Sequence, residues 1–225
     1  MHNLNKITKI LGATLVLVAS NAALAEDLTI SSTATVDNTI DFTVLGTLDF
    51  GTLRATAAVA ADNCAVLVLP ADATADISSA LVSGSEANEL CQGALGSTND
   101  MVVQSVGGTI VRPEFTVAGL AEFTTLTITV PERPINNDDI YLSQGGDPTG
   151  AAVLEMVDFT IYQTNATPAD IPVTAGDADI TSDATGDITF TLGATLVTDV
   201  AGTTSAVSQY VNQPYTGNFD VSVNY

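Results

Sequence analysis

Apolar and polar residues alternate with a period of two along much of this chain. The alternation is clearest in residues 28–44, 124–130, 157–162, 188–192 and 219–225, and a shorter apolar run covers residues 66–69. A β-strand directs successive side chains to opposite faces, so this period is typical of strands with one buried face. The pattern therefore predicts a series of short β-strands.

Turn-forming residues separate these segments. Gly107-Gly108, Pro131, the stretch 144–150 and the Asp/Gly-rich stretch 175–187 are the main examples. Short strands with turns between them are typical of sandwiches and barrels. We expect an all-β fold, a two-sheet antiparallel β-sandwich of the immunoglobulin-like or pilin-like type. One short helix is expected around residues 76–90, and residues 83–103 and 163–187 are expected to be insertions or loops.

The chain closes on a strong strand pattern. Phe219, Val221, Val223 and Tyr225 occupy one face of the last seven residues. Burying such side chains fully is worth about 1.5–3 kcal/mol each. We expect this final strand to belong to the core.

The first 25 residues have the features of a secretory signal peptide. Lys6 and Lys9 precede the apolar run 10–18, and Ala23-Leu24-Ala25 is a small-residue cleavage site. Cleavage after Ala25 would leave residues 26–225 as a single sandwich domain. The expected location is the periplasm, the cell surface or the extracellular space, with no membrane span in the mature chain.

The charge is strongly negative. The chain has 26 acidic residues and a net charge of −21, and after residue 25 its basic residues are Arg54, Arg112 and Arg133. A surface of this kind repels phosphate backbones and anionic lipids. A nucleic-acid partner is therefore not expected.

Two cysteines, Cys64 and Cys91, are present. In an exported protein the default is a disulfide between them, worth about 3.5 kcal/mol in the loop-entropy account. The alternative is a redox or metal-ligating pair. The single histidine, His2, lies in the signal segment. Catalysis by Ser–His or Cys–His pairs is thus excluded for the mature chain, and we expect a protein that is not an enzyme.

Calcium is the one metal ion with support from the sequence. Asp177, Asp179, Asp183 and Asp187 lie on a Gly-flanked stretch, and residues 136–139 read NNDD. Hard cations bind several oxygen ligands, although this spacing is not that of an EF-hand. The alternative is a solvated acidic loop. No other cofactor is expected.

Three stretches resemble a bacterial exported family known as domain of unknown function 4402. They are residues 48–53 (LDFGTL), residues 114–131, and residues 188–200 together with 215–225 (YTGNFDVSVNY). The resemblance extends over about residues 40–225. It implies a β-sandwich in a secreted or cell-surface setting, with no established activity and no catalytic residues.

A more remote similarity connects the chain to pilin-type subunits, which also end on an alternating strand. Such subunits begin with an alternating extension that completes the sheet of a neighbour. Residues 26–44 resemble such a donor strand through Leu28, Ile30, Ala34 and Val36. The alternative is that these residues form the first strands of their own domain.

These observations lead to one expected function and two alternatives. We expect an exported structural or adhesive protein of the cell surface or extracellular space, with itself as its partner in a filament or matrix. The first alternative is a filament subunit that assembles by exchange of the donor strand. The second is a secreted carbohydrate-binding module or carbohydrate-active enzyme with a glycan partner.

Overall fold

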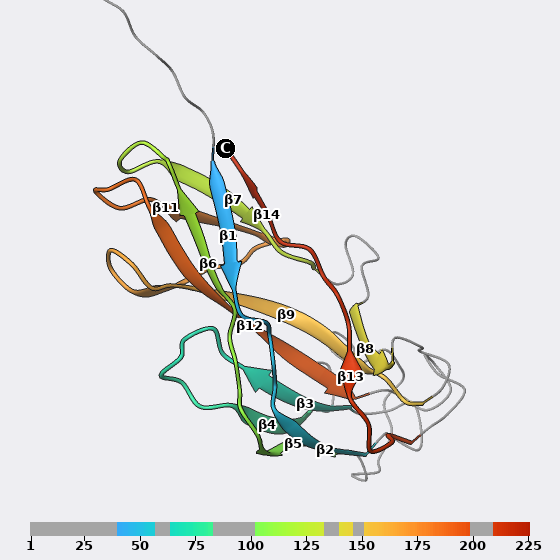
Figure 1. The fold of residues 1–225 in the computed structure, drawn as a ribbon. Coiled ribbons are helices and arrows are strands. Elements are labelled where there is room, and N and C mark those ends of the chain that lie inside the picture. The colour runs from blue at the N-terminus through green and yellow to red at the C-terminus, as the bar shows by residue number, and fades with distance from the viewer. Residues whose placement is uncertain (1–39, 57–63, 83–101, 133–139, 146–150, 199–208) are drawn as a thin grey trace, which may run out of the picture. The chain divides into compact units, whose positions relative to one another are not determined.

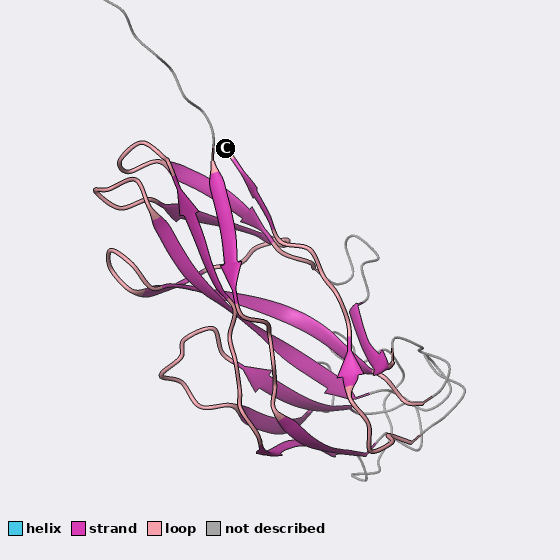
Figure 2. Ribbon diagram, viewed as in Figure 1, coloured by secondary structure: helices cyan, strands magenta, loops and turns pink. Residues whose placement is uncertain are grey.

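The fold consists of strands joined by turns and irregular loops (Figures 1 and 2). The computed structural model describes residues 40–56, 64–82, 102–132, 140–145, 151–198 and 209–225, which belong to one unit, Asn38–Tyr225. The signal segment 1–25 and the donor candidates Leu28, Ile30, Ala34 and Val36 lie outside these residues. No helix occurs in the described ranges, and accordingly none is long and apolar enough to cross a membrane.

Fourteen strands are present in the described part of the chain. They are β1 (Asp41–Leu45), β2 (Thr52–Thr56), β3 (Cys64–Leu69), β4 (Ser78–Val82), β5 (Val102–Gly107), β6 (Glu114–Ala118), β7 (Thr125–Thr129), β8 (Ile140–Gln144), β9 (Leu154–Gln163), β10 (Ala169–Ile171), β11 (Asp177–Thr181), β12 (Ile188–Thr198), β13 (Tyr215–Thr216) and β14 (Ser222–Asn224).

The largest sheet has nine strands and an antiparallel ladder throughout. Its main path is β1-β6-β12-β9-β8-β13, while β3 pairs with β12 and β4, and β10 pairs with β9. Strand β12 is the longest, and ten of its eleven residues are buried. A strand covered on both faces explains the near-continuous apolar run in its second half.

Two smaller sheets complete the fold, one ordered β11-β7-β14 and one formed by β2 and β5. On β7, Leu126 and Ile128 are buried while the intervening threonines face outward. The outward hydroxyls of Thr127 and Thr129 each donate a 2.8 Å hydrogen bond to an aspartate on β11. This alternation is what the sequence pattern of residues 124–130 predicts.

One hydrophobic core is shared by strands of all three sheets. Its aromatic centre is a stack in which the ring centroids of Phe42 and Phe115 lie 5.7 Å apart and those of Phe115 and Phe190 lie 5.0 Å apart. Antiparallel sheets packed on a common core confirm the expected all-β, sandwich-like fold.

The helix expected around residues 76–90 is wrong over the part that the structure describes. Residues 78–82 form strand β4, which pairs with β3 through Ala80 opposite Val66. The side chains of residues 78–81 are exposed because β4 lies at the edge of the large sheet. The sequence of residues 78–82 therefore lacks the alternation of apolar and polar residues that would identify a strand. Residues 83–90 lie outside the described ranges.

The two expected insertions also contain strands. The stretch 163–187 includes β10 and β11, and Ala178 and Ile180 of β11 are buried in the core. The aspartates on the outer face of β11 are the reason why the sequence predicted an acidic loop here. The last residues of the stretch 83–103 begin β5, with Val103 buried, and residues 83–101 lie outside the description.

The closing segment contributes less burial than expected. Phe219, Val221 and Val223 pack against the core but are only half-buried, and Tyr225 is 69% exposed. The pairing of β14 with β7 ends at Asn224, so Tyr225 lies beyond the ladder. The prediction that Tyr225 is buried is therefore wrong.

Candidate functional site

The first and last described segments of the chain contribute many of the side chains that cover the core only partly. Many apolar side chains here pack against the core and yet remain half-buried. They are Ile40, Phe42, Leu48, Leu53 and Ala55 from the first segment and Tyr210, Phe219, Val221 and Val223 from the last. We call residues 40–55 and 210–223 the seam. Further cover along the seam would remove apolar surface from water.

Part of the seam opens into a groove with a volume of about 830 Å³. Its walls are two continuous segments, residues 47–55 and 210–218, and its floor includes Leu142, Leu154 and Leu196 of the large sheet. In Figure 1 these walls run through β2 and β13. Strands β2 and β13 form part of these walls, while Gly51 (φ +78°) and the turn closed by the Gln213 amide and the Val211 carbonyl interrupt them.

The first wall is held from one side. β2 pairs with β5, and Asp49 exchanges two 2.9 Å backbone hydrogen bonds with Val111. No other strand of the described part pairs with β2. Within the described ranges one edge of β2 thus has no strand partner, and an edge of this kind can pair with a further strand.

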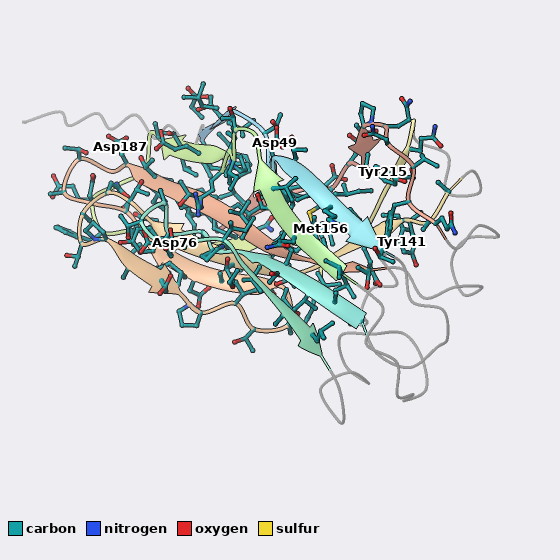
Figure 3. All side chains as sticks on the ribbon, turned by 90° about the horizontal axis from the view of Figure 1, so that it is seen from below. Asp49, Asp76, Tyr141, Met156, Asp187 and Tyr215 are labelled. Carbon is teal, nitrogen blue, oxygen red and sulfur yellow. The ribbon has the colours of Figure 1, made fainter. Side chains whose placement is uncertain are left out.

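The second wall is held by two tyrosines and a glycine. The hydroxyl of Tyr210 donates to the carbonyl of Val153 at 2.8 Å, and the hydroxyl of Tyr215 accepts from the amide of Val211 at 2.9 Å. At Gly217 a Cβ atom would lie 2.5 Å from the carbonyl oxygen of Tyr141. Only glycine permits this close approach to β8, and Figure 3 shows Tyr141 and Tyr215 on the same side of the view.

Few charged side chains occur among the described residues that line the groove. Among the described residues that line it, Asp49 is the single carboxylate and Arg54 the single cation. Glycoside hydrolysis needs two carboxyl groups facing each other, about 5–9.5 Å apart. The described lining of the groove does not contain such a pair. The remaining polar groups are amides and hydroxyls beside an aliphatic floor.

The four calcium candidates do not converge on one point. Asp177 and Asp179 accept hydrogen bonds from threonines on the outer face of the β7–β11 pair, whereas Asp183 and Asp187 belong to the turn after β11. Within the described ranges, no group of three or more acidic, His or Cys side chains could hold a metal ion. Residues 136–139 lie outside them. Figure 3 shows Asp187 far from Tyr215 and the groove wall.

Asp183 organises this turn by accepting several hydrogen bonds. Its Oδ1 accepts from the hydroxyl of Thr185 at 2.7 Å and from the backbone amides of Thr185 and Asp187, and its Oδ2 accepts from Asn165 at 3.0 Å. These bonds, the one from the Thr185 hydroxyl foremost, lower the pKa of Asp183 to about 2. The carboxylate of Asp183 thus stabilises the turn through these hydrogen bonds.

This pKa predicts an acid-dependent contribution to stability. The native pKa of about 2 lies below the ordinary value of 3.8. A lowered native pKa stabilises the fold above the unfolded-state pKa, and this stabilisation is lost as the pH falls through the native pKa. We expect Asp183→Asn to lower the free energy of unfolding at pH 7, with a difference from wild type that shrinks between about pH 4 and pH 2. Urea titrations at several pH values measure it.

A second variant separates the hydrogen bonds from charge in general. Thr185→Val removes the hydroxyl group that lowers the pKa of Asp183 most. In a protein that carries Thr185→Val, the additional substitution Asp183→Asn should therefore change the free energy of unfolding with a smaller dependence on pH. A difference between wild type and Asp183→Asn that stays constant down to pH 2 would contradict this account.

Cys64 lies at the start of β3 and is fully buried. It is not a free thiol. Cys91 lies outside the described residues, so the pairing of Cys64 with Cys91 stays a prediction. The burial of Cys64 fits a structural role more closely than a reactive one, because reactive thiols are partly exposed.

The sequence did not predict the groove, although two of its motifs contribute residues to the groove walls. Residues 48–53 lie within the first wall, and Tyr215 and Gly217 of the closing motif lie within the second. More than 150 residues separate the two walls along the chain, so no local pattern could have joined them.

Comparison of the chain with family models, with curated proteins and with solved structures gave no match. The similarity to the family of unknown function therefore stays a prediction, and the function is argued from the geometry of the groove.

Proposed function

We propose that this chain is an exported, non-enzymatic structural subunit of the cell surface or extracellular matrix, and that its groove accepts an extended polypeptide segment. The observation that carries the proposal is the groove between residues 47–55 and 210–218, where half-buried apolar side chains and an unpaired edge of β2 occur together. Assembly of subunits would follow from such an interaction.

A β-strand is the occupant that this groove fits best. An added strand pairs its backbone with the free edge and places every second side chain over the core. Strand β2 has five residues and is about 17 Å long, so a strand added along it would place two or three side chains over the core. The aliphatic floor of Leu142, Leu154 and Leu196 supports apolar side chains at these positions.

The carbohydrate alternative has less support from the same residues. Sugar rings usually stack on exposed aromatic faces, but Tyr210 and Tyr215 pack against each other with ring centroids 5.9 Å apart. Both hydroxyls already take part in internal hydrogen bonds. We therefore favour a polypeptide over a glycan as the occupant.

Filling the groove should weaken assembly. Ala55 is half-buried and lines the groove, so Ala55→Phe would place a ring where the incoming strand must lie. Overpacking of this kind costs about 1–3 kcal/mol, and 1.4 kcal/mol corresponds to tenfold. We expect the mature wild-type chain to form oligomers in light scattering after gel filtration, and Ala55→Phe to weaken their association about tenfold or more.

Thr56→Phe is the matched control, because Thr56 is exposed and does not line the groove. Its oligomers should resemble those of the wild type. Equal effects of the two substitutions, with both variants folded by circular dichroism, would exclude the groove as the assembly site.

A further inference from the structure

A single cation in the groove wall identifies the kind of strand that the groove accepts. Resting on the proposed function, we infer that Arg54 selects a strand with an acidic side chain opposite it and an aliphatic side chain on each side of that acid. The partner is thus an extended peptide segment with the pattern aliphatic–acidic–aliphatic. Arg54 determines which segment binds, while the apolar floor holds the two aliphatic side chains.

The first observation is the alternation along β2. From Leu53 to Thr56 the pairing of β2 with β5 runs without a register shift, so this part of β2 is a regular strand. Leu53 and Ala55 pack against the core, whereas Arg54 is exposed on the outer face. A strand added at the other edge of β2 would alternate in the same way. The residue opposite Arg54 would therefore lie on the outer face, and its two neighbours would face the core.

The second observation is that Arg54 has neutral surroundings on the outer face. Across the strand pair, β5 places the neutral side chain of Gln104 opposite Arg54. The other exposed side chains of the two strands are neutral as well, and they are those of Thr52, Thr56, Val102 and Val106. Within the described ranges no acidic residue forms an ion pair with Arg54. In a chain with 26 acidic residues, this cation is thus open to a carboxylate from a partner.

The third observation concerns Asp49, the one carboxylate in the described lining of the groove. Its Oδ1 accepts a hydrogen bond from the amide of Gly51 at 2.8 Å, and its backbone pairs with that of Val111. These bonds hold Asp49 before the start of β2. Its carboxylate therefore does not neutralise Arg54.

The attraction at Arg54 acts at shorter range than the repulsion from the rest of the chain. Residues directly opposite each other on antiparallel strands have Cβ atoms about 4.5–5.5 Å apart. The Debye length in about 0.15 M salt is about 8 Å, so more distant carboxylates are largely screened. An opposite-charge pair across two strands then raises the affinity about two- to fivefold. A like-charge pair lowers it by a similar factor.

Binding of three synthetic peptides to the secreted chain tests the inference. The peptides carry a dye and read Ser-Thr-Thr-Val-X-Val-Thr-Thr-Ser, where X is Glu, Gln or Lys, and fluorescence anisotropy in about 0.15 M salt gives each Kd. We expect the Glu peptide to bind about two- to fivefold more tightly than the Gln peptide, and the Lys peptide to bind more weakly than either. The negative net charge of the chain alone would produce the opposite order.

Three substitutions sharpen the test. Arg54→Glu should reverse the order, so that the Lys peptide binds most tightly. Gln104→Glu would supply a carboxylate to Arg54 from β5 and should therefore reduce the preference for the Glu peptide. Thr181→Glu is the matched control, because it adds the same charge at an exposed position of β11 in another sheet and should leave the preference unchanged. Circular dichroism verifies that all variants are folded.

The outcomes separate this inference from the proposed function. Equal affinities of the three peptides, all weakened by Ala55→Phe, would overturn the role of Arg54 and leave the strand-accepting groove intact. Tightest binding of the Lys peptide to the wild type would do the same, and so would a preference for the Glu peptide that persists in Arg54→Glu. If no peptide binds, or if Ala55→Phe leaves all three affinities unchanged, both the inference and the proposed function are overturned.

Discussion

Gly193→Ala will lower the free energy of unfolding by about 3 kcal/mol or more, although it adds a single methyl group. A Cβ atom at Gly193 would lie 2.2 Å from the carbonyl oxygen of Leu69, 2.4 Å from the amide nitrogen of Ala71 and 2.6 Å from the carbonyl carbon of Pro70. All three are backbone atoms, so no side chain can rotate away to make room. Strand β12 must separate from the end of β3.

The surrounding contacts prevent an easy separation. The hydroxyl of Thr191 donates to the carbonyl of Ala71 at 2.8 Å, and the amide of Ala71 donates to the hydroxyl of Thr160 at 3.2 Å. The guanidinium of Arg112 also donates to the carbonyls of Pro70 and Ala75. A shift of residues 70–75 would break several of these hydrogen bonds together.

Chemical denaturation followed by circular dichroism measures the effect. Gly145→Ala is the matched control, since nothing lies within 4 Å of its Cβ position and its φ is +59°. That substitution should cost only about 1 kcal/mol, from the left-handed backbone conformation. Similar losses in the two variants would mean that the close approach at Gly193 does not govern stability.

Phe190→Ala will cost about 3–5 kcal/mol, the range for a fully buried aromatic side chain. Phe190 has no exposed surface, and its ring stacks on that of Phe115 at 5.0 Å with an interplanar angle of 10°. The ring of Phe115 stacks in turn on Phe42 of β1. The cavity left by Phe190→Ala would therefore loosen the packing of Phe115 at the centre of the core. It would also weaken the stacking of Phe115 on Phe42 of β1.

Two measurements test this second prediction. Denaturation gives the total loss, and hydrogen exchange should show faster exchange in β1 than in β11, which lies in another sheet. Phe123→Ala is the control, because Phe123 is 67% exposed in the turn before β7 and its removal should change stability by less than about 0.5 kcal/mol. A loss at Phe190 no larger than at Phe123 would contradict the aromatic stack as a core element.

The sequence predicted the strands that contain a stretch of alternating apolar and polar residues. This stretch covers all of β7 but only parts of β9 and β12, and the second half of β12 is buried on both faces. β4 was missed because it lies at a sheet edge, and β11 was missed because its aspartates suggested a loop. The partner of β11 is distant in sequence, β7, whereas β4 pairs with β3, the strand that precedes it.

The candidate site was predictable only in its parts. The acidic residues Asp177 and Asp183 were visible in the sequence, but only hydrogen-bond geometry shows that one faces threonines on a sheet and the other organises a turn. The groove depends on two segments that are far apart in the sequence. It also depends on Gly217, whose close approach to Tyr141 is a tertiary contact.

The scarcity of basic residues has a consequence for proteolysis. Trypsin cleaves after Lys or Arg unless Pro follows, and beyond residue 25 both Arg112 and Arg133 are followed by Pro. The bond after Arg54 is then the sole tryptic site, and it lies in the wall of the groove. A subunit with a filled groove would present no accessible cut, whereas an empty one would yield two fragments at most. Resistance to trypsin would thus report, in a single digestion, how many subunits have found a partner.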